Sequence, residues 1–306
     1  MSDVVPAACD HADLEKWISD ADVDPQQQLI RRVVRLILNG IAHSTELREL
    51  MVIKGGVLLA TAYNTGRHTI DVDFSTRQLV KDIDIDALCQ KLDQSIESSS
   101  QMLNESLVCR VQSHKLQPPS LESTFPTLRI RIGYAQRGSK AQARLSKGAS
   151  PHVVIVDLSF NEDPGNPVSL KIDGHGVLKA YSLESQMAEK FRALIQQQER
   201  FRGRVRRQDA FDIFRVLEQG FFSSAQSRLA LVCAICKSCR SRDIEAHVHS
   251  LADPEIRQRA AKEYDQLRFE IDGELPDFDQ VFDRVCQFYS ELPWGNRSGL
   301  SKNAKA

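Results

Sequence analysis

The sequence predicts an α+β fold: a mixed sheet with flanking helices, followed by a helical C-terminal domain. Two observations carry this prediction. Segments with the alternating or continuous apolar character of strands lie between about residues 47 and 178, interleaved with a few helical stretches. From Ser182 onward, the apolar residues recur at helical spacing only. The length of 306 residues allows one large domain or two modest ones.

The first expected helix follows Asp24 and has Pro25 at its first position, where proline is favoured. The stretch ELMVIKGG is expected to form a short buried strand that ends in Gly55 and Gly56. A short helix over VLLATAYNTG, closed by Gly66, should follow. The alternation and β-branched residues of HTIDVDFS then predict a second strand.

The rest of the chain divides at clear turn signals. An amphipathic helix over DIDALCQKLDQSIESSS precedes a strand over SLVCRVQSHKL, and Pro118-Pro119 marks a loop. Two strands, TLRIRIGYAQ and HVVIVDLSF, are joined by the basic loop RGSKAQARLSKGAS. Helices are expected over 183–198, 208–219, 225–239, 254–268 and 278–290. The expected domains are an N-terminal helical segment (1–46), an α/β core (47–178), a helical domain (179–292) and a disordered tail (293–306).

Composition excludes several classes of protein. A net charge of −1 gives no indication of a polyanion partner, so any basic surface must be local. The N-terminus lacks the features of a signal peptide, and no apolar run approaches membrane-spanning length, so we expect no membrane partner. Seven scattered cysteines, an odd number, suit reduced thiols in a cytoplasm better than a disulfide framework.

Two carboxylates stand out on an expected strand. Asp71 and Asp73 are two residues apart, so both point to one face, while Ile70, Val72 and Phe74 take the other. Like charges that close repel unless a cation lies between them. Mg²⁺ would solve this problem, because it takes oxygen ligands and leaves coordination positions for substrate phosphates.

The glycine pair lies between an expected strand and an expected helix. Gly55 and Gly56 would let backbone N–H groups approach a phosphate at a helix N-terminus. Alone, a glycine pair is usually a turn, and a D-x-D pattern is usually a solvated strand edge. The order and spacing of the two features favour a phosphate cradle beside a metal site.

A third carboxylate, Asp157, lies in an apolar strand that we expect to be central and buried. A buried acid needs a partner. One interpretation is a structural salt bridge to Arg129 or Arg131 on the preceding strand. The other is a third metal ligand that assists deprotonation of an attacking hydroxyl, and the sequence leaves both open.

The helical half carries a second polar cluster. Lys190 lies at the edge of an apolar helical stripe, and Asp209 and Asp212 share a helical face that leans inward. Residues 189–207 hold seven basic residues against two acidic ones. They form either a solvated helix end or a local surface for a polyanion. The seven are Lys190, Arg192, Arg200, Arg202, Arg204, Arg206 and Arg207.

Two further features are ambiguous. Cys236 and Cys239 form a C-x-x-C pair with His247 and His249 downstream, so zinc is conceivable, but the helical periodicity around them favours core thiols. The strand-connecting loop could touch nucleic acid or could be a soluble hairpin end. Its basic residues are Arg137, Lys140, Arg144 and Lys147.

Two blocks of the sequence resemble a known family. KGGVLLATAYNTGRHTIDVDFS resembles the K-G-G-[ST]…R-x-[ST]-x-D-x-D-[FL] signature of AbiEii/AbiGii-type nucleotidyltransferase toxins, a branch of the DNA polymerase beta-like nucleotidyltransferase superfamily. YSLESQMAEKFRALIQQQERFRGRVRRQDAFDIFRV resembles the second block of the same family. The resemblance implies a polymerase-beta-like mixed sheet and Mg²⁺ or Mn²⁺ as cofactor.

The resemblance also implies roles for individual residues. The catalytic residues would be Asp71, Asp73, Asp157, Lys190 and Asp209, of which the first three would hold the metal. Residues that would bind the nucleotide or the acceptor are Lys54, Gly55, Gly56, Arg67, Thr69, Arg206, Arg207 and Asp212.

The implied reaction is attack of an acceptor hydroxyl on the α-phosphate of an NTP, with pyrophosphate leaving. The expected acceptor is a tRNA 3′ end, and the expected partner is a separately encoded antitoxin. Two alternatives stay open: protein phosphorylation on the same fold, and an inactive scaffold that binds only nucleotide or a partner. This chain departs from the family pattern at Val57, where Ser or Thr is usual, and at Gln208, where Arg is usual.

Overall fold

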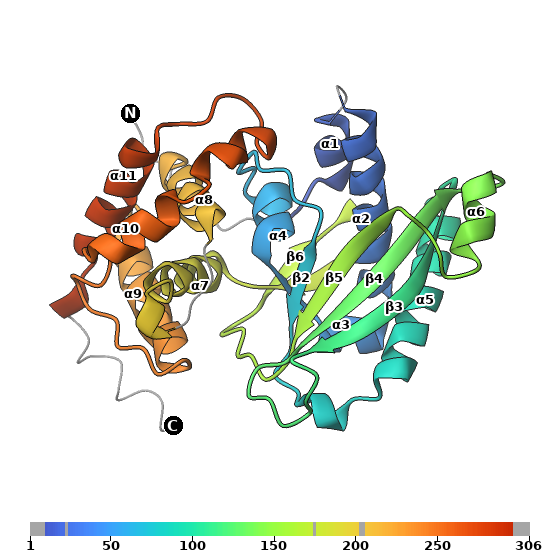
Figure 1. Ribbon diagram of the computed structural model, residues 1–306, viewed down its shortest axis with the longest axis horizontal. Coiled ribbons are helices and arrows are strands. Elements are labelled where there is room, and N and C mark those ends of the chain that lie inside the picture. Colours follow the sequence, from blue (N-terminus) through green and yellow to red (C-terminus); the bar gives the residue numbers. More distant parts are fainter. Residues whose placement is uncertain (1–9, 22–23, 174–175, 202–205, 296–306) are drawn as a thin grey trace. The chain divides into compact units, whose positions relative to one another are not determined.

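The computed structural model describes residues 10–21, 24–173, 176–201 and 206–295 (Figure 1). The described chain divides into two compact units. The sheet unit contains residues 10–64 and 68–181, and the helical unit contains residues 65–67 and everything from Ser182 onward. That the segments on either side of residue 178 are independently folding domains stays a prediction. None of the helices in the described ranges combines the length and the apolar character that crossing a membrane requires.

The sheet unit is built on a mixed sheet, which confirms the predicted fold class. Strands lie in the order β3-β4-β5-β2-β1-β7-β6. The pairs β1–β7 and β2–β5 are parallel, and the other neighbours are antiparallel. The strands are β1 (Val52–Lys54), β2 (Val72–Ser75), β3 (Leu107–Gln117), β4 (Thr127–Gln136), β5 (Val153–Ser159), β6 (Val168–Lys171) and β7 (Val177–Ala180).

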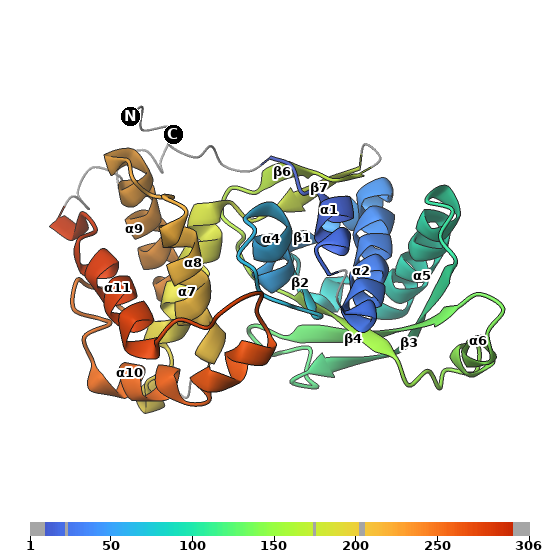
Figure 2. The ribbon, with the colours of Figure 1, turned by 90° about the horizontal axis from the view of Figure 1, so that it is seen from above.

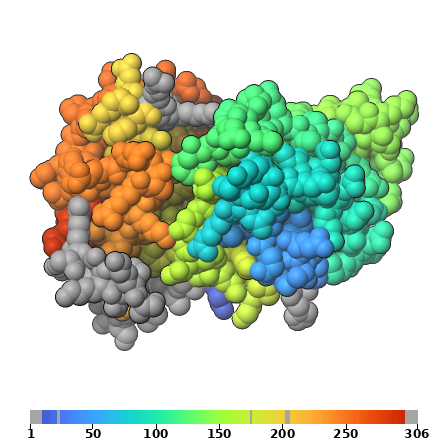
Figure 3. Space-filling model, turned by 90° about the horizontal axis from the view of Figure 1, so that it is seen from below, coloured from blue at the N-terminus to red at the C-terminus, as the bar shows by residue number. Residues whose placement is uncertain are grey.

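Helices of the sheet unit lie on both faces of the sheet. α2 and α5 lie on one side and α6 on the other (Figure 2). In the space-filling view, the light green segment with α6 lies along one side of the green β3–β4 segment, and the cyan segment of α5 lies along the other (Figure 3). The helices are α1 (Leu14–Ser19), α2 (Pro25–His43), α3 (Thr45–Leu50), α4 (Gly55–Ala62), α5 (Ile85–Met102) and α6 (Lys140–Leu145), with a 3₁₀ turn η1 (Val80–Asp82).

The two faces of the sheet differ in character. Val72, Phe74, Val156 and Leu158 are fully buried on the face that α2 and α5 cover. Their neighbours along the strands point to the other face, where Asp73 and Asp157 are partly buried and Ser75 is fully buried. Strand β5 is an interior strand of the sheet, as expected, but its second face is partly buried rather than fully buried.

Several local expectations are confirmed by the structure. α2 begins at Pro25, and the side chain of Asp24 accepts hydrogen bonds from the N–H groups of Gln26 and Gln27. α5 and the strands β3, β4 and β5 form where the sequence predicts them.

Other local expectations were wrong. The first expected strand is shorter than the stretch ELMVIKGG. Glu49 and Leu50 belong to helix α3, whose first turn is capped by the Ser44 hydroxyl accepting from the N–H of Leu47, and β1 begins only at Val52. The basic loop contains helix α6, capped in the same way by Ser139. Ile70 precedes β2 and is half-exposed, so it does not share the buried face with Val72.

The helical unit contains helices where the sequence predicts them, apart from one that is divided. Its core packs Phe191 of α7 against Phe288 and Tyr289 of α11. The expected helix over 254–268 is divided at Lys262 into α10 and a 3₁₀ turn. The elements are α7 (Leu183–Ile195), η3 (Glu199–Phe201), α8 (Arg207–Glu218), α9 (Ala225–Arg240), α10 (Pro254–Ala261), η4 (Tyr264–Phe269) and α11 (Phe278–Ser290). Most of the expected tail, 296–306, lies outside the described residues.

Candidate active site

A row of charged residues crosses the partly buried face of the sheet. Strand pairing places Lys54 opposite Asp73, Asp73 beside Asp157, and Asp157 opposite Arg129. Residues that pair across neighbouring strands share a face. The sheet therefore brings together two of the three predicted carboxylates and sets a basic residue at each end of the row.

The glycine loop touches this row directly. Gly55 opens α4 with a backbone φ of +77°, which L-residues rarely adopt. A Cβ on Gly55 would lie 2.2 Å from Oδ2 of Asp73, so the carboxylate occupies the space that any side chain would need. The side chain of Lys54, the N-cap residue of α4, makes no capping hydrogen bond. Asp73 therefore lies against the first turn of the helix predicted to receive a phosphate.

Asp157 makes the ion pair that the structural interpretation proposed. Nε of Arg129 donates to Oδ1 of Asp157 at 3.0 Å, and Nη2 donates to Oδ2 at 2.6 Å. The hydrogen bond to Asp157, opposed by partial burial and reinforced by the charges of Asp157, Asp71 and Asp73, raises the pKa of Arg129. Arg129 thus neutralises part of the negative charge of this face, and a further role for Asp157 as a ligand stays a prediction.

Asp71 precedes strand β2 rather than lying within it. Its carbonyl oxygen accepts a hydrogen bond from the hydroxyl of Thr69 at 3.5 Å, and its side chain is partly buried. Its charge acts on Arg129, so it belongs to the same electrostatic environment as Asp73. Only Asp73 of the D-x-D pair therefore lies within β2, and Asp71 lies in the segment directly before it.

Lys54 is held on the sheet unit by two residues that sequence reasoning missed. Its ammonium group forms an ion pair with Glu162, and it lies 5.7 Å from the ring centroid of Tyr181. Tyr181 is itself fixed by a hydrogen bond of 2.9 Å from the hydroxyl of Ser75 to its own. A signal for Glu162 was present, because it is an acid directly after the β5 strand that carries Asp157.

Val57 is completely buried in α4. The position at which the family usually carries Ser or Thr is therefore one whose side chain, here that of Val57, packs in the core. Gly56, also predicted to bind nucleotide, is buried at the second position of the same helix.

The helical unit contains a separate buried ion cluster. Nζ of Lys190 donates to Oδ1 of Asp209 at 3.0 Å and to Oδ2 of Asp212 at 2.7 Å. Nε of Arg67 donates to the other oxygen of Asp212 at 3.0 Å. Arg67 belongs to the short segment 65–67, which pairs with the helical unit through a bridge to Ile271. The four predicted residues of this cluster are therefore in contact.

Burial and charge oppose each other in this cluster. Burial alone would lower the pKa of Lys190, but the carboxylates of Asp212 and Asp209 outweigh it and raise that pKa. Burial alone would raise the pKa of Asp212, but Arg67 and Lys190 lower it. Oδ2 of Asp209 is buried and has no hydrogen-bond partner. That oxygen is an acceptor available to a ligand.

The described part of the basic stretch 189–207 is divided: Arg200 and Arg206 are exposed, whereas the other described basic residues are buried or ion-paired. Lys190 and Arg192 are buried, and Arg192 donates to Ser238 and Gln196. Arg207, predicted to bind substrate, forms ion pairs with Glu263 and Glu270. Arg206 is exposed at the N-cap of α8. Arg202 and Arg204 lie outside the described residues.

The donor side chains limit which metal ions this chain could hold. No group of three or more His, Cys, Asp or Glu side chains within the described ranges is arranged to hold a metal ion. Mg²⁺ commonly takes only one or two protein carboxylates together with substrate phosphates, so Asp71 and Asp73 fit such an ion while Asp157 is held by Arg129. The zinc alternative finds no support: Cys239 is fully buried and burial raises its pKa to about 12.

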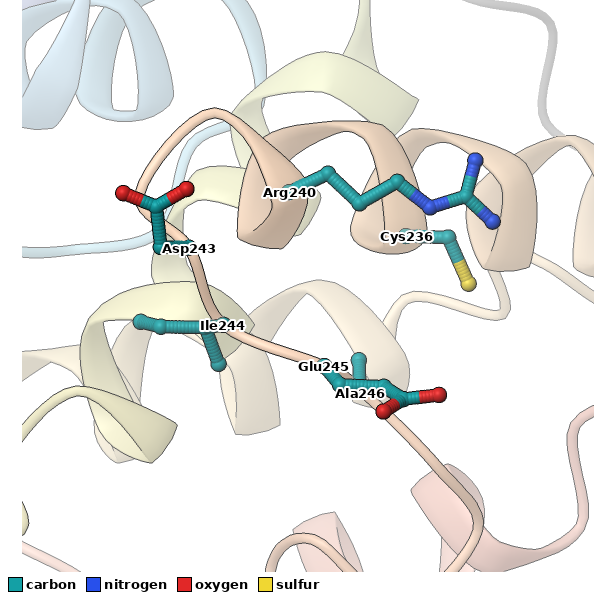
Figure 4. Close-up of a pocket in the computed structure, with 6 residues that line it drawn as sticks. All are labelled: Cys236, Arg240, Asp243, Ile244, Glu245 and Ala246. Carbon is teal, nitrogen blue, oxygen red and sulfur yellow. The ribbon is translucent and has the colours of Figure 1, made fainter.

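A cavity of about 370 Å³ lies in the helical unit. The residues that line it, between Cys236 and Ala246, include none of the predicted site residues. In Figure 4, the thiol of Cys236 and the guanidinium group of Arg240 point to the same side of α9. Asp243 and Glu245 on the following segment also line it. Its mixed charges show no carboxylate pair beside a phosphate cradle, so it does not compete with the sheet face as an active site.

The fold resembles that of a solved structure. JHP933 from Helicobacter pylori has a similar structure, with a TM-score of 0.50 and 12% identity over 88% of this chain and 92% of that chain. MenT4, a nucleotidyltransferase toxin from Mycobacterium tuberculosis H37Rv, matches with a TM-score of 0.45 and 12% identity over 90% and 97%. At 12% identity, the likeness to JHP933 concerns the fold alone. A search of curated protein sequences gave no significant match.

The family model is more specific. The model described as nucleotidyl transferase AbiEii toxin, type IV toxin–antitoxin system, matches residues 36–284, well over half of the chain. This match spans the glycine loop, the D-x-D pair, Asp157 and the Lys190 cluster. The chain therefore belongs to the AbiEii family of nucleotidyltransferase toxins, as its two sequence blocks predicted, and it is a transferase enzyme.

Proposed function

We propose that this enzyme transfers a nucleoside monophosphate from an NTP to the 3′ hydroxyl of an RNA, with a tRNA 3′ end as acceptor. The observation that carries the proposal is the contact of Asp73 with the Gly55 turn. A phosphate received at the N-terminus of α4 would lie beside a carboxylate suited to a divalent ion. Substrate phosphates and metal ligands are thus adjacent on one short stretch of chain.

Asp71 and Asp73 would hold Mg²⁺ or Mn²⁺. When bound, such an ion supplies neutralisation of phosphate charge and orientation of the phosphoryl group. Asp157, which retains lone pairs beyond those used by Arg129, is proposed to accept the proton of the attacking hydroxyl. The new bond joins the acceptor oxygen to the α-phosphorus. The bond from that phosphorus to the β-phosphate oxygen breaks, and pyrophosphate leaves.

For the helical cluster, we propose a role in binding the triphosphate. Lys190 and Arg67 supply positive charge, and Oδ2 of Asp209 is an acceptor without a partner. In the structure described, Lys190 is fully engaged by Asp209 and Asp212. A triphosphate that uses its ammonium group would have to compete with those carboxylates. Arg206 and Thr69 are also proposed to bind substrate, as the resemblance implies.

We also propose a cognate antitoxin protein as partner, as expected for a toxin of this family, and a cytoplasmic location. The described cysteines are free thiols, which suits a reducing compartment.

Labelled nucleotides test the reaction. Wild-type protein and Asp73→Asn are incubated with Mg²⁺, with α-labelled or γ-labelled NTPs, and with total tRNA or no RNA. We expect α-label on RNA with the wild type and a loss of at least about a hundredfold with Asp73→Asn, because a metal ligand is removed. Asp86→Asn, which alters an exposed carboxylate on α5, is the matched control and should retain activity.

The same experiment separates the alternatives. Label from the γ-position on protein, and none from the α-position on RNA, would favour phosphorylation of a protein hydroxyl. Absence of any Asp73-dependent transfer would favour a scaffold that binds nucleotide only. Either result would overturn the proposed reaction.

A further inference from the structure

We infer that the polar face of strands β3 and β4, continued by α6, binds the single-stranded backbone of the RNA acceptor. This surface, the β3–β4 face, is defined by Lys115, Arg131, Lys140, Arg144 and Lys147. The inference rests on the proposed function, since it names where the RNA lies as it approaches the carboxylates of the sheet unit.

The first observation is a strong local segregation of charge. Between Glu122 and Asp157 the chain contains no acidic residue. It contains six basic residues there, although the net charge of the whole chain is only −1. Two of them form ion pairs, Arg129 with Asp157 and Arg137 with Glu97, and the other four are available to a polyanion. The six are Arg129, Arg131, Arg137, Lys140, Arg144 and Lys147.

The second observation is the register of the strands. Lys115 of β3 pairs with Arg129 of β4, and Ser113 pairs with Arg131. Because Arg129 reaches Asp157 on the polar face, Lys115 and Arg131 point to that face as well. His114, which lies between Ser113 and Lys115, bonds to Asp86 of α5 on the opposite face and confirms the alternation.

The third observation is the state of these cations. Arg129 is used by Asp157, but Lys115 and Arg131 are exposed, and neither side chain has a hydrogen bond or an ion pair within the described chain. Cations without a protein partner on one face are available to phosphates. The same holds for three residues in and after α6: Lys140, Arg144 and Lys147.

Helix α6 extends the surface on the same face. A Cβ on Gly133 would touch the side chains of Gln112 and Leu145, so α6 packs over the strand at Gly133. Gly133 and Arg129 differ by four residues, so they share the polar face of β4. Figures 2 and 3 show α6 on the side of the sheet away from α5. From Arg129, the basic side chains therefore continue for roughly 13 Å of strand to α6.

The chemistry of this face favours a nucleic-acid backbone. The residues of β3 and β4 that point to it after the bulge are polar, basic or small, and none of them is aromatic. Binding would therefore use phosphate contacts rather than stacking, would tolerate different sequences and would depend strongly on salt. The surface adjoins Asp157 through Arg129, so a strand lying on it would deliver its end to the carboxylates.

The test compares Lys115→Gln/Arg131→Gln with wild type and with Lys16→Gln/Lys91→Gln, which removes two exposed lysines from α1 and α5. Binding of an end-labelled single-stranded RNA of about 12 nucleotides is measured from 0.05 to 1 M salt. Each lost phosphate contact should reduce the slope of log K against log salt by about 0.7. The test variant should lose about 1.4, which is roughly 25-fold in affinity at 0.1 M if both proteins converge at 1 M. The control should match the wild type.

Kinetics provide the second measurement. The test variant should show a KM for RNA raised at least about tenfold, with the KM for NTP unchanged, because phosphate contacts to RNA alone are lost. Lys140→Gln/Arg144→Gln should act in the same direction. Melting temperatures of all variants should agree, because the substituted side chains are exposed.

Failure of this inference is distinguishable from failure of the proposed function. If the wild type transfers nucleotide to RNA and the variants keep its salt slope and KM, the RNA surface is wrong and the reaction stands. If no transfer occurs but RNA binding is lost in the variants, the surface stands and the reaction is wrong.

Discussion

Arg129 and Asp157 are joined across the β4–β5 pairing by two hydrogen bonds of 3.0 and 2.6 Å, on the face that also carries Asp73. The guanidinium group thus stands at the end of a row of carboxylates whose mutual repulsion it reduces. Because Arg129 is partly exposed, this pair should matter more for the geometry of the site than for folding.

Arg129→Met should reduce nucleotide transfer at least about tenfold, while lowering the free energy of unfolding by about 1 kcal/mol or less. The carboxylates of Asp73 and Asp157 would lose their shared counter-charge, whereas the core face of the sheet would be unaltered. Arg129→Lys should retain intermediate activity. Turnover and urea unfolding measure the two effects. Arg110→Met, which removes a comparable exposed ion pair with Asp93, is the control. Equal turnover for Arg129→Met and Arg110→Met would contradict the prediction.

Gly55→Ala should abolish nucleotide transfer. A methyl group would meet Oδ2 of Asp73 at 2.2 Å, and the φ of +77° is strained for any L-residue. Displacing the carboxylate would remove a proposed metal ligand. Gly220→Ala is a matched control, since Gly220 has a φ of +79° and open space around its Cβ position. Both should lose about 1–2 kcal/mol of stability from backbone strain, but only Gly55→Ala should lose activity. Activity in Gly55→Ala comparable with Gly220→Ala would refute the close contact.

Lys190→Met should destabilise the helical unit by about 3–5 kcal/mol, because it leaves Asp209 and Asp212 buried with only Arg67 to neutralise them. Urea unfolding monitored by tryptophan fluorescence measures the loss. The charge-conserving change Lys190→Arg tests whether bulk rather than charge is responsible. A loss below about 1 kcal/mol for Lys190→Met would show that the cluster does not contribute as a buried ion network.

Acid should weaken the fold through Asp212. Burial opposes the charged form of Asp212, but Arg67 and Lys190 outweigh it, so its folded pKa lies below its unfolded value. The sign follows from linkage: its stabilisation is present above the unfolded pKa, near 3.8, and is lost as the pH falls through the lower folded pKa. Lys190 has a raised pKa, so its contribution is complete below the unfolded value near 10.5 and is lost at higher pH, through the folded pKa.

Urea midpoints of the wild type and of Asp212→Asn, taken at several pH values from 2 to 7, measure this contribution. We expect the wild type to lose more stability than Asp212→Asn as the pH falls below about 4, so the two curves approach each other. Parallel curves over the whole range would show that the carboxylate of Asp212 contributes no pH-dependent stability.

Chelation should leave the fold of the nucleotide-free enzyme unchanged. Cys239 is fully buried, and burial raises its pKa to about 12, so its thiol is protonated at neutral pH and is unsuited to zinc. The melting temperature should be the same with and without EDTA. Cys239 should react with a thiol reagent only after unfolding, as peptide mapping would show. A drop of several degrees in EDTA would indicate a structural metal.

Local sequence patterns predicted much of this structure. Asp24 and Pro25 determine the start of α2, because capping and a fixed φ act within one turn. The pattern was wrong at Glu49 and Leu50, which were expected to begin a strand but end helix α3, because the helix that Ser44 caps continues to Leu50. It also missed Glu162 as the partner of Lys54, since the two residues are far apart in sequence and meet only through the sheet.

The sequence by itself determined the family, the D-x-D pair beside a glycine turn, and the second block around Lys190, because these are short-range spacings of chemically specific residues. Only the tertiary structure decided that Arg129, and not Arg131, pairs with Asp157. Arg129 and Arg131 share a face, so the choice depends on the strand register, which places Arg129 opposite Asp157 and Arg131 opposite Ile155. The same register turns Lys115 and Arg131 toward the carboxylate face, where charges that are scattered along the chain form one surface.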